Sequence, residues 1–468
     1  MVGITGYSVY IPRHRLPRAV IAAAWGGRAV PGCKAVRHFD EDSLTMGQAA
    51  LWRLLECGAA PEALYFASTT APHWQRSSAS MIAAACGLPA EVATADFGGS
   101  LRCGATALAA AFNAVAAGAR RQMAVVASDS RDGAPESAEE ITFGDAAASI
   151  AVGSEGVIAE LVSRASRSDD FLDEWRRDTD DTVTSLASKF STTRGYQANV
   201  VEAARGALQQ AGVDPKQVTR AALASPDGQS HAGAAKALGI PPERVEDSRL
   251  GDIGVTGAAM PLLLLAQALD RAQPGDWILA AAYGDGANAF LFRATDRIAE
   301  LPRPLVAPDP APLECRSYAV YRKLRHFLRD HAGGPEMSNV LWEREEPQNV
   351  RLRGTFCPRC GRLQFPQTRV CGGCRSTEGL VEKPLARAGR LFTFTKDYLY
   401  DAPAQPTIMA VVDLDGGGRF LCQMTDAAPD RVGIGMEIEL VLRRMREGPS
   451  MHHYYWKCRP AGAPGVTP

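Results

Sequence analysis

The chain has 468 residues, of which 46% are hydrophobic and 22% charged, an ordinary globular composition that allows large cores. With a formal net charge of −1, the chain has no overall electrostatic field that would attract nucleic acid or an anionic membrane. No apolar run reaches the roughly 20 residues that span a bilayer. Four of the eleven cysteines have metal-site spacing, so we expect a cytoplasmic protein rather than a disulfide-linked one. Residues 1–16 lack a signal-peptide core.

A turn, a helix and a strand between residues 96 and 128 organise the first half of the chain. The glycine-rich turn at 98–100 leads into an alanine-rich helix over 105–117, and Gly118 separates this helix from a strand at 123–127. Such a turn directs backbone N–H groups and the positive end of the helix dipole toward a nucleophile or an anionic intermediate. Around it we expect strands at 2–10 and 64–69, helices at 43–57 and 77–86, and a hairpin of 141–152 with 157–162.

The following residues repeat this order. Residues 143–152, FGDAAASIAV, match residues 283–292, YGDGANAFLF, and each segment follows a turn, a helix and a strand. The match predicts an internal duplication, so that residues 1–296 form one pseudo-twofold, layered α/β body with a mostly parallel sheet. Chance similarity between two Gly-Asp turns is the alternative. The expected elements of the second half are helices at 196–211, 231–238 and 258–272 and strands at 220–224 and 277–283.

Residues 297–345 change in character. A proline-rich linker comes first, with prolines at 302, 304, 308, 310 and 312, and a basic amphipathic helix is expected at 315–331. Its charges form either an anion-binding or docking face or, as we favour, a solvated face. The charged residues are Arg316, Arg322, Lys323, Arg325 and Arg329.

Residues 357–374, CPRCGRLQFPQTRVCGGC, contain two Cys-x-x-Cys pairs separated by ten residues. Each pair offers two thiolates, and a hairpin between the pairs would bring all four together. Four cysteines leave no open coordination position, so the spacing predicts a structural, tetrahedral zinc site. Four unliganded thiols or a rubredoxin-type iron are the alternatives. The predicted ligands are Cys357, Cys360, Cys371 and Cys374.

Residues 381–460 are rich in short strands separated by glycine turns, which is typical of a small barrel of the OB type. The segment has no strongly basic face with interleaved aromatic residues, so we discount nucleic acid as a partner. The five expected strands cover residues 389–395, 407–414, 419–424, 436–444 and 454–459.

These motifs resemble two known families. Residues 1–296 resemble the thiolase superfamily in its ketoacyl-ACP synthase III and HMG-CoA synthase branch, through the start VGITGYSVYIPRHRL, the 96–118 unit, the FGD turn and the segment PGDWILAAAYGDGANAFLF. Residues 315–460 resemble the zinc-ribbon and OB-fold proteins that accompany such thiolases. The resemblance implies a duplicated five-layer α-β-α-β-α fold followed by a ribbon and a barrel. The expected divisions are 1–165, 166–296, 297–345, 346–380 and 381–468.

The resemblance also implies a catalytic set that this chain does not keep. In the family a cysteine nucleophile stands five residues after an aspartate, a place that Leu101 occupies here relative to Asp96. The family histidine falls on Asp227, with His231 as the nearest imidazole. The asparagine that follows a glycine corresponds to Asp252.

Leucine cannot attack a thioester, so the ordinary acyl-enzyme route through Leu101 is excluded. Cys103 would serve only if the turn were remodelled, and otherwise packs as a small buried residue. His231 is either a base or a surface residue at a helix start. Asp227 and Asp252 would act as proton shuttles if they lie in an apolar cleft, or else they cap helices and turns.

Three functions remain open. The first is an acyl-CoA lyase or synthase that makes or breaks a C–C bond by aldol chemistry without a cysteine nucleophile, with the barrel holding the acyl or CoA portion. The second is acyl transfer through Cys103, and the third is a non-catalytic partner of an active thiolase. An enzyme predicts an open tunnel at Leu101 faced by Asp227 and Asp252, and a scaffold predicts a filled one. The substrate is an acyl-CoA or acyl-carrier-protein thioester, and we expect a homodimer that pairs through strand 123–127.

Overall fold

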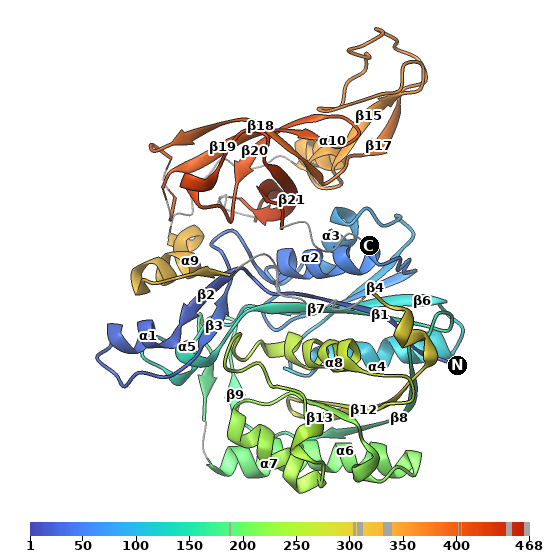
Figure 1. Ribbon diagram of the computed structural model, residues 1–468, viewed down its shortest axis with the longest axis vertical. Coiled ribbons are helices and arrows are strands. Elements are labelled where there is room, and N and C mark those ends of the chain that lie inside the picture. The colour runs from blue at the N-terminus through green and yellow to red at the C-terminus, as the bar shows by residue number, and fades with distance from the viewer. Residues whose placement is uncertain are drawn as a thin grey trace.

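The computed structural model describes residues 1–186, 189–302, 306, 312–330, 339–400, 402–403, 405–445 and 452–462. Three of the expected linker prolines, at 304, 308 and 310, lie outside these residues. In Figure 1 the α/β body occupies the lower part of the molecule, and the C-terminal ribbon and barrel lie above it.

Nine strands of the body form one hydrogen-bonded network in the order β11-β12-β13-β8-β1-β7-β6-β4-β5. β1 (Gly3–Tyr10) joins the two halves, because it pairs along its length with β7 (Ala146–Gly153) and through its first two residues with β8 (Ala159–Ser168). The expected hairpin of 141–152 with 157–162 is therefore wrong, since β1 separates its two strands. The other strands are β4 (Ala63–Ala67), β5 (Ala93–Phe97), β6 (Gln122–Asp129), β11 (Arg220–Leu223), β12 (Trp277–Tyr283) and β13 (Gly286–Ala294).

Helices lie outside both halves of the sheet and between them. From top to bottom, Figure 1 shows α2 and α3, the sheet with β1 and β7, then α4 and α8, the sheet with β12 and β13, and finally α6 and α7. This confirms the expected five-layer α/β fold. The expected mostly parallel sheet is wrong, because five of the eight strand pairs in the network are antiparallel and three are parallel. Its helices are α2 (Ser43–Glu56), α3 (Ser78–Ala85), α4 (Cys103–Ala116), α6 (Ala198–Ala211), α7 (Gly228–Leu238) and α8 (Met260–Arg271).

The central layer explains the small residues of the 96–128 segment. A Cβ atom on Gly104 of α4 would lie 2.8 Å from the carbonyl oxygen of Ala258 and 3.0 Å from Cβ of Ala127. α4 can approach its neighbours this closely only because it lacks side-chain volume there. The antiparallel pairs β6–β7 and β12–β13 follow α4 and α8 respectively, which agrees with the internal duplication.

β6, which contains the strand expected to pair two subunits, is an internal strand. It pairs with β4 on one side and with β7 on the other, so its backbone groups are already hydrogen-bonded. The expectation that residues 123–127 pair across a twofold axis is therefore wrong. β5 and β11 are the edges of this sheet.

α9 (Tyr318–Asp330) is the expected basic helix, and it contacts the body. Arg325 is buried, and its guanidinium lies 2.9 Å from Asp145 and 3.4 Å from Asp132. These contacts contradict the solvated-face prediction for Arg325 and show a docking face on this chain's own body. The neighbouring short elements are β2 (His14–Pro17), α1 (Arg18–Ala24), β3 (Cys33–Val36), α5 (Ala138–Thr142) and β14 (Leu313–Glu314). α10 (Asn339–Asn349) lies instead beside β15 (Arg353–Cys357) of the C-terminal part (Figure 1).

The C-terminal part forms the two expected units. A three-stranded sheet carries the four-cysteine segment, and its strands are β15 (Arg353–Cys357), β16 (Arg362–Gln364) and β17 (Val381–Pro384). A closed five-stranded barrel follows, in the order β18-β19-β20-β22-β21. The barrel strands are β18 (Ala388–Asp397), β19 (Thr407–Leu414), β20 (Arg419–Met424), β21 (Glu437–Arg444) and β22 (Tyr454–Pro460).

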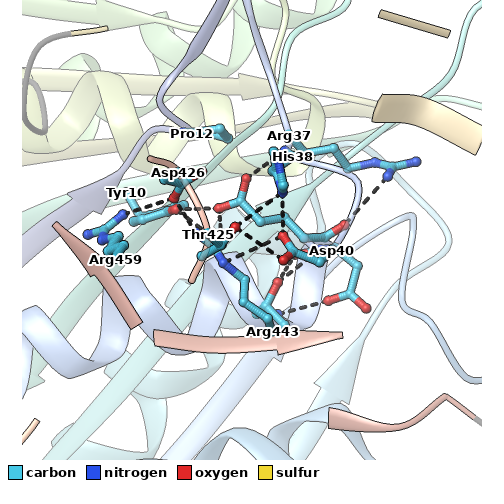
Figure 2. A network of polar contacts seen from close by, with 12 residues as sticks. Tyr10, Pro12, Arg37, His38, Asp40, Thr425, Asp426, Arg443 and Arg459 are labelled. Atoms are coloured by element: carbon cyan, nitrogen blue, oxygen red, sulfur yellow. Dashed lines mark hydrogen bonds and ion pairs between the residues drawn. The ribbon is translucent and has the colours of Figure 1, made fainter. Parts of the chain in front are cut away.

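A buried network of charged groups joins the barrel to the body (Figure 2). At its centre the carboxylate of Asp40 lies 2.7 Å from Nδ1 of His38 and accepts hydrogen bonds from Lys457 Nζ at 2.8 Å and Thr425 Oγ1 at 3.2 Å. Arg443 of the barrel donates to Glu41 of the body and, at 2.5 Å, to Asp426 of the barrel. The body and the barrel therefore share one set of compensated charges.

A stacked arginine forms a second contact between the two units. The guanidinium of Arg387 lies 3.4 Å from the ring centroid of Trp52 in α2 and 4.3 Å from that of Trp456 in β22. The same side chain donates a hydrogen bond of 2.5 Å to the carbonyl oxygen of Ala85. Both contacts fix the barrel against α2 and α3.

Candidate active site

A cavity of about 710 Å³ opens at the carboxyl ends of β4, β5, β6, β11 and β12. Neighbouring parallel strands end together at this edge, which is where open α/β sheets bind their ligands. Segment 170–176 and residues after each strand form its wall. The lining residues used below are Thr69, His73, Asp96, Leu101, Arg131, Phe143, Asp170, Asp173, Glu174, Arg176, Tyr196, Asp227, Tyr283 and Asp285.

Leu101 lines this cavity at the start of α4. It stands two residues before the first helical residue, Cys103, on the turn that contains Gly99 with a φ of 78°. The backbone of Gly284 closes over the turn, because a Cβ atom there would lie 3.0 Å from the backbone nitrogen of Leu101. Because Leu101 belongs to the cavity lining, the open space expected at this residue is present.

Cys103 lies behind this turn rather than at the cavity. Only 3% of the residue is exposed, and it does not belong to the cavity lining. Burial, together with the nearby negative charge of Asp129, raises the pKa of the Cys103 thiol well above its ordinary value. Both properties disfavour a thiolate and agree with a small residue packed in the central layer.

The structure brings Asp227 to the cavity but not His231. Asp227 caps α7 by accepting a hydrogen bond of 2.8 Å from the backbone N–H of Ser230, and its exposed side chain lines the cavity. His231 follows on the first turn of α7, outside the lining. Burial lowers the pKa of its imidazole.

Asp252 also lies outside the lining. Its carboxylate pairs with Arg249, with a shortest distance of 2.5 Å, and the side chain is about half exposed (48%). The expectation that Asp227 and Asp252 both face the tunnel is therefore met by Asp227 alone. The ion pair with Arg249, three residues earlier in the chain, accounts for the position of the Asp252 side chain.

Three further residues of the cavity were missed in the sequence. His73 and Arg131 follow β4 and β6, and their position after buried parallel strands was the available signal. Burial and the neighbouring His452 lower the pKa of His73 to about 4, so its imidazole is neutral near pH 7. Tyr196, buried on the segment that leads into α6, gave no such signal.

Asp129 holds the turns around the cavity in place. This buried carboxylate accepts hydrogen bonds from the backbone N–H groups of Thr69 and Ala258, both at 2.7 Å, and from Ser68 Oγ at 2.9 Å. Because one side chain bonds the loops after β4 and before α8, the two halves of the duplicated body meet at a fixed geometry there.

The four cysteines of the ribbon fit a zinc ion. Their sulfur atoms all lie within 4.8 Å of one another, and the closest approaches are 3.6 Å for Cys357 with Cys374 and 3.5 Å for Cys360 with Cys371. Tetrahedral zinc with bonds of about 2.3 Å separates its sulfur ligands by about 3.8 Å. These residues would hold zinc as a structural cross-link between the two turns, and none of them belongs to the cavity lining.

We expect one zinc ion per chain by elemental mass spectrometry of the purified protein. Cys371→Ser should lower zinc well below one equivalent and make the ribbon sensitive to protease, because structural zinc supplies much of the folding energy of such small units. Cys57→Ser removes an exposed cysteine outside the cluster and should keep the full zinc content. Iron in place of zinc, or zinc retained by Cys371→Ser, would contradict the assignment.

Solved structures show that the body has a thiolase-like fold. An HMG-CoA synthase complexed with CoA superposes with a TM-score of 0.63 and 16% identity, covering 72% of this chain and 95% of that chain. The 3-oxoacyl-[acyl-carrier-protein] synthase III of Aquifex aeolicus VF5 superposes with a TM-score of 0.56 and 20% identity, covering 63% of this chain and 100% of that chain. The family model for the C terminal part of 3-oxoacyl-[acyl-carrier-protein] synthase III matches residues 208–293, and that for the C-terminal OB-fold domain of ChsH2 matches residues 382–443.

Sequence relatives define the family more closely. The hydroxymethylglutaryl-CoA synthase of Methanopyrus kandleri is 32% identical over 345 residues, covering 70% of this chain and 98% of the relative. The hydroxymethylglutaryl-CoA synthase of Aeropyrum pernix is 32% identical over 343 residues, covering 70% of this chain and 94% of the relative. The chain belongs to the hydroxymethylglutaryl-CoA synthase family and carries a C-terminal OB-fold domain of the ChsH2 type. Within the described residues, no helix has the length and apolarity to cross a membrane.

Proposed function

We propose that this protein forms or cleaves a C–C bond in an acyl thioester by aldol-type chemistry, without a cysteine nucleophile. The observation that carries the proposal is the open cavity at Leu101, in the chain of a family whose relatives are named as hydroxymethylglutaryl-CoA synthases. A leucine at the start of α4 offers hydrophobic contact to an acyl group but no covalent step. A body that served only as a scaffold would have no need for this space.

The cleavage direction needs a base, an enolate site and a final proton. A base removes the proton of a 3-hydroxyl group, the bond between C2 and C3 breaks, and a carbonyl compound leaves. The bonding electron pair becomes the thioester enolate, which then takes a proton at C2. Asp227 is the proposed base, because its carboxylate reaches the cavity.

A neutral hydrogen-bond donor on the cavity wall supports the enolate part of the proposal. Burial raises the pKa of Tyr196 well above its ordinary value, so its phenol keeps its proton at neutral pH. A retained phenol proton can stabilise a developing oxyanion. Tyr196 therefore takes this role in the proposed reaction.

The barrel flanks the same cavity. His452, close to the start of β22, lies with Nε2 3.0 Å from the carbonyl oxygen of Pro72, and its ring centroid is 5.0 Å from that of His73 in the cavity wall. This contact supports a role for the barrel in holding the thioester carrier beside the entrance. The carrier is CoA or the phosphopantetheine arm of a carrier protein.

Acyl transfer through Cys103 and a scaffold role remain the alternatives. The buried thiol of Cys103 and its raised pKa weigh against the first, and the open cavity weighs against the second. For the homodimer we propose pairing through β5 (Ala93–Phe97), an edge strand whose outer backbone groups have no partner in the nine-stranded network.

The test is intact-protein mass spectrometry with a panel of acyl-CoA and 3-hydroxyacyl-CoA thioesters, with the small-molecule products analysed in parallel. We expect cleavage or condensation products without a protein adduct. Asp227→Asn should reduce turnover by at least 100-fold because it removes the proposed base. Asp252→Asn is the matched control and should stay within about threefold of wild type.

Each other result selects an alternative. An acyl adduct on Cys103 would restore a nucleophilic mechanism. Absence of both products and adducts over the whole panel would favour the scaffold. Loss of turnover in Asp252→Asn, with Asp227→Asn unaffected, would transfer the base to Asp252.

A further inference from the structure

Carboxylates outnumber cations in the lining of the cavity. Six carboxylates accompany two guanidinium groups there, so the formal charge of the described lining is −4. Arg131 pairs with Glu174, and the exposed Arg176 donates to two backbone carbonyl oxygens. His73 adds no charge near pH 7, because burial lowers the pKa of its imidazole to about 4. The cavity therefore favours a cation over an anion. Its carboxylates are Asp96, Asp170, Asp173, Glu174, Asp227 and Asp285.

Two of these carboxylates lie close to each other beside the turn that carries Leu101. The backbone of Gly284 packs on this turn, and Asp285 follows it with a φ of 46°. Asp173 accepts a hydrogen bond from the phenol of Tyr283. Burial, together with the charge of Asp285, raises the pKa of Asp173. A positive charge beside the two carboxylates would relieve this repulsion.

The protein itself supplies no paired cation at this place. Arg102 lies near enough for its charge to interact with Asp285, but its Nη1 donates to the carbonyl oxygen of Arg167 at 2.9 Å and to Asn288 Oδ1 at 3.1 Å. Among the described residues, neither Asp170 nor Asp285 has an ion-pair partner, and both side chains are exposed and line the cavity. Their charge is therefore available to a ligand.

Two tyrosines complete the surroundings of a cation. The rings of Tyr196 and Tyr283 both line the cavity and meet at 81°, with centroids 5.5 Å apart. Only 1% of Tyr196 is exposed, and its phenol oxygen has no hydrogen-bond partner among the described residues. The nearby hydroxyl of Ser225 donates instead to the carbonyl oxygen of Asp227 at 2.8 Å. A phenol oxygen accepts an N–H bond while donating its own proton elsewhere, and aromatic ring faces attract cations.

We propose that Asp173, Tyr196, Tyr283 and Asp285 bind an ammonium group on the acyl chain, so that the substrate of this cavity is the thioester of an amino-substituted acid. The inference rests on the proposed function of the cavity as an acyl-thioester site, and it adds the class of acyl group. An ammonium has three N–H donors, which suit the two carboxylates and the unpartnered phenol oxygen. The proposed function places the carrier beside the barrel, so only the acyl chain has to enter this acidic space.

The test measures binding of two unreactive thioethers by calorimetry. S-(4-aminobutyl)-CoA and S-pentyl-CoA have the same chain length and differ only in a terminal ammonium in place of a methyl group. The wild-type protein should bind the ammonium compound about tenfold more tightly. Asp285→Asn should lower this ratio to about threefold or less, because it removes one charge at a positive φ that asparagine also adopts. Asp178→Asn makes the same change at an exposed residue outside the lining and should keep the tenfold ratio.

The outcomes separate this inference from the proposed function. Equal binding of both thioethers by the wild type, tighter binding of S-pentyl-CoA, or a ratio that Asp285→Asn leaves unchanged overturns the ammonium site and leaves the thioester site standing. Failure of both thioethers to bind counts against the thioester site itself, and the inference falls with it. Tyr196→Phe supplies a second test if Asp285→Asn does not fold: it removes the phenol oxygen and should also lower the ratio, and an unchanged ratio would contradict the inference.

Discussion

Arg443→Met should lower the free energy of unfolding by about 3–5 kcal/mol and release the barrel from the body. The arginine is fully buried between Glu41 of the body and Asp426 of the barrel (Figure 2). Methionine keeps most of the side-chain length but leaves these carboxylates without their shared cation. Urea unfolding followed by tryptophan fluorescence measures the loss, and limited proteolysis reports release of the barrel.

Arg419→Met is the control for charge removal on the same barrel. Arg419 pairs with Asp413 at 2.6 Å, but both side chains are about half exposed (52% and 47%), so the loss of stability should be far smaller than that of Arg443→Met. Equal losses of stability in Arg443→Met and Arg419→Met would mean that burial of the network contributes nothing to stability. A stable, protease-resistant Arg443→Met variant would show that the barrel is held by other contacts such as the Arg387 stack.

The pH dependence of the free energy of unfolding distinguishes the loss of the Arg443 charge from the loss of its packing contacts. Burial acts to raise the pKa of Asp426, but Arg443 and His38 outweigh it and hold the pKa at about 2. A carboxylate with a lowered pKa stabilises the fold above its unfolded value of about 3.9 and loses this contribution as the pH falls toward 2. Arg443→Met lacks much of this contribution already. The difference in stability between wild type and variant should therefore narrow between about pH 4 and pH 2, whereas a packing defect would leave it unchanged.

Local spacing was sufficient for the four-cysteine cluster, because two Cys-x-x-Cys pairs joined by a hairpin bring four sulfur atoms together. The family resemblance, through the offset from Asp96, was sufficient to expect Leu101 on the turn at the start of α4. Both inferences depend on neighbours within one segment. Asp227 was placed at the cavity for a related reason, because it follows the end of a short buried strand, β11.

Contacts between distant segments could not be predicted in the same way. β1 comes first in the chain but pairs between β7 and β8, which nothing in the local pattern of residues 141–162 reveals. The duplicated body requires this arrangement because β1 links its two sheets. Arg325 illustrates the same limit for charges: its helix is amphipathic and basic, but its partners Asp132 and Asp145 lie almost 200 residues earlier.

The network at Asp40 gives the barrel a fixed place beside the cavity. Barrel residues Lys457, Arg443 and Thr425 reach charged groups of segment 38–41, which leads directly into α2. The same barrel brings His452 to the cavity residue His73. A substitution in the buried network should therefore alter the geometry of the cavity wall at His73.

Leu101→Cys should convert the protein from one that forms no acyl adduct to one that does. The side chain at this position faces the cavity, unlike Cys103, and it stands at the positive end of the α4 dipole, which lowers the pKa of a thiol. The thiolate sulfur would attack the thioester carbonyl carbon, and the thiolate of CoA would leave, so the protein gains the mass of the acyl group. Intact-protein mass spectrometry should detect up to one adduct per chain within the time that leaves wild type unmodified.

Peptide mapping assigns the adduct, because trypsin cleaves after Arg102 and so separates residue 101 from Cys103. Leu101→Ser provides a variant of the same size without a thiol, and it should stay unmodified. A folded Leu101→Cys variant that resists acylation by every thioester tested would mean that the thioester carbon does not reach the start of α4. The cavity would then serve another ligand. An adduct of equal yield on Cys103 in the wild type would instead show that the turn opens in solution, and that leucine at position 101 has moved the nucleophile two residues along the helix rather than abolished it.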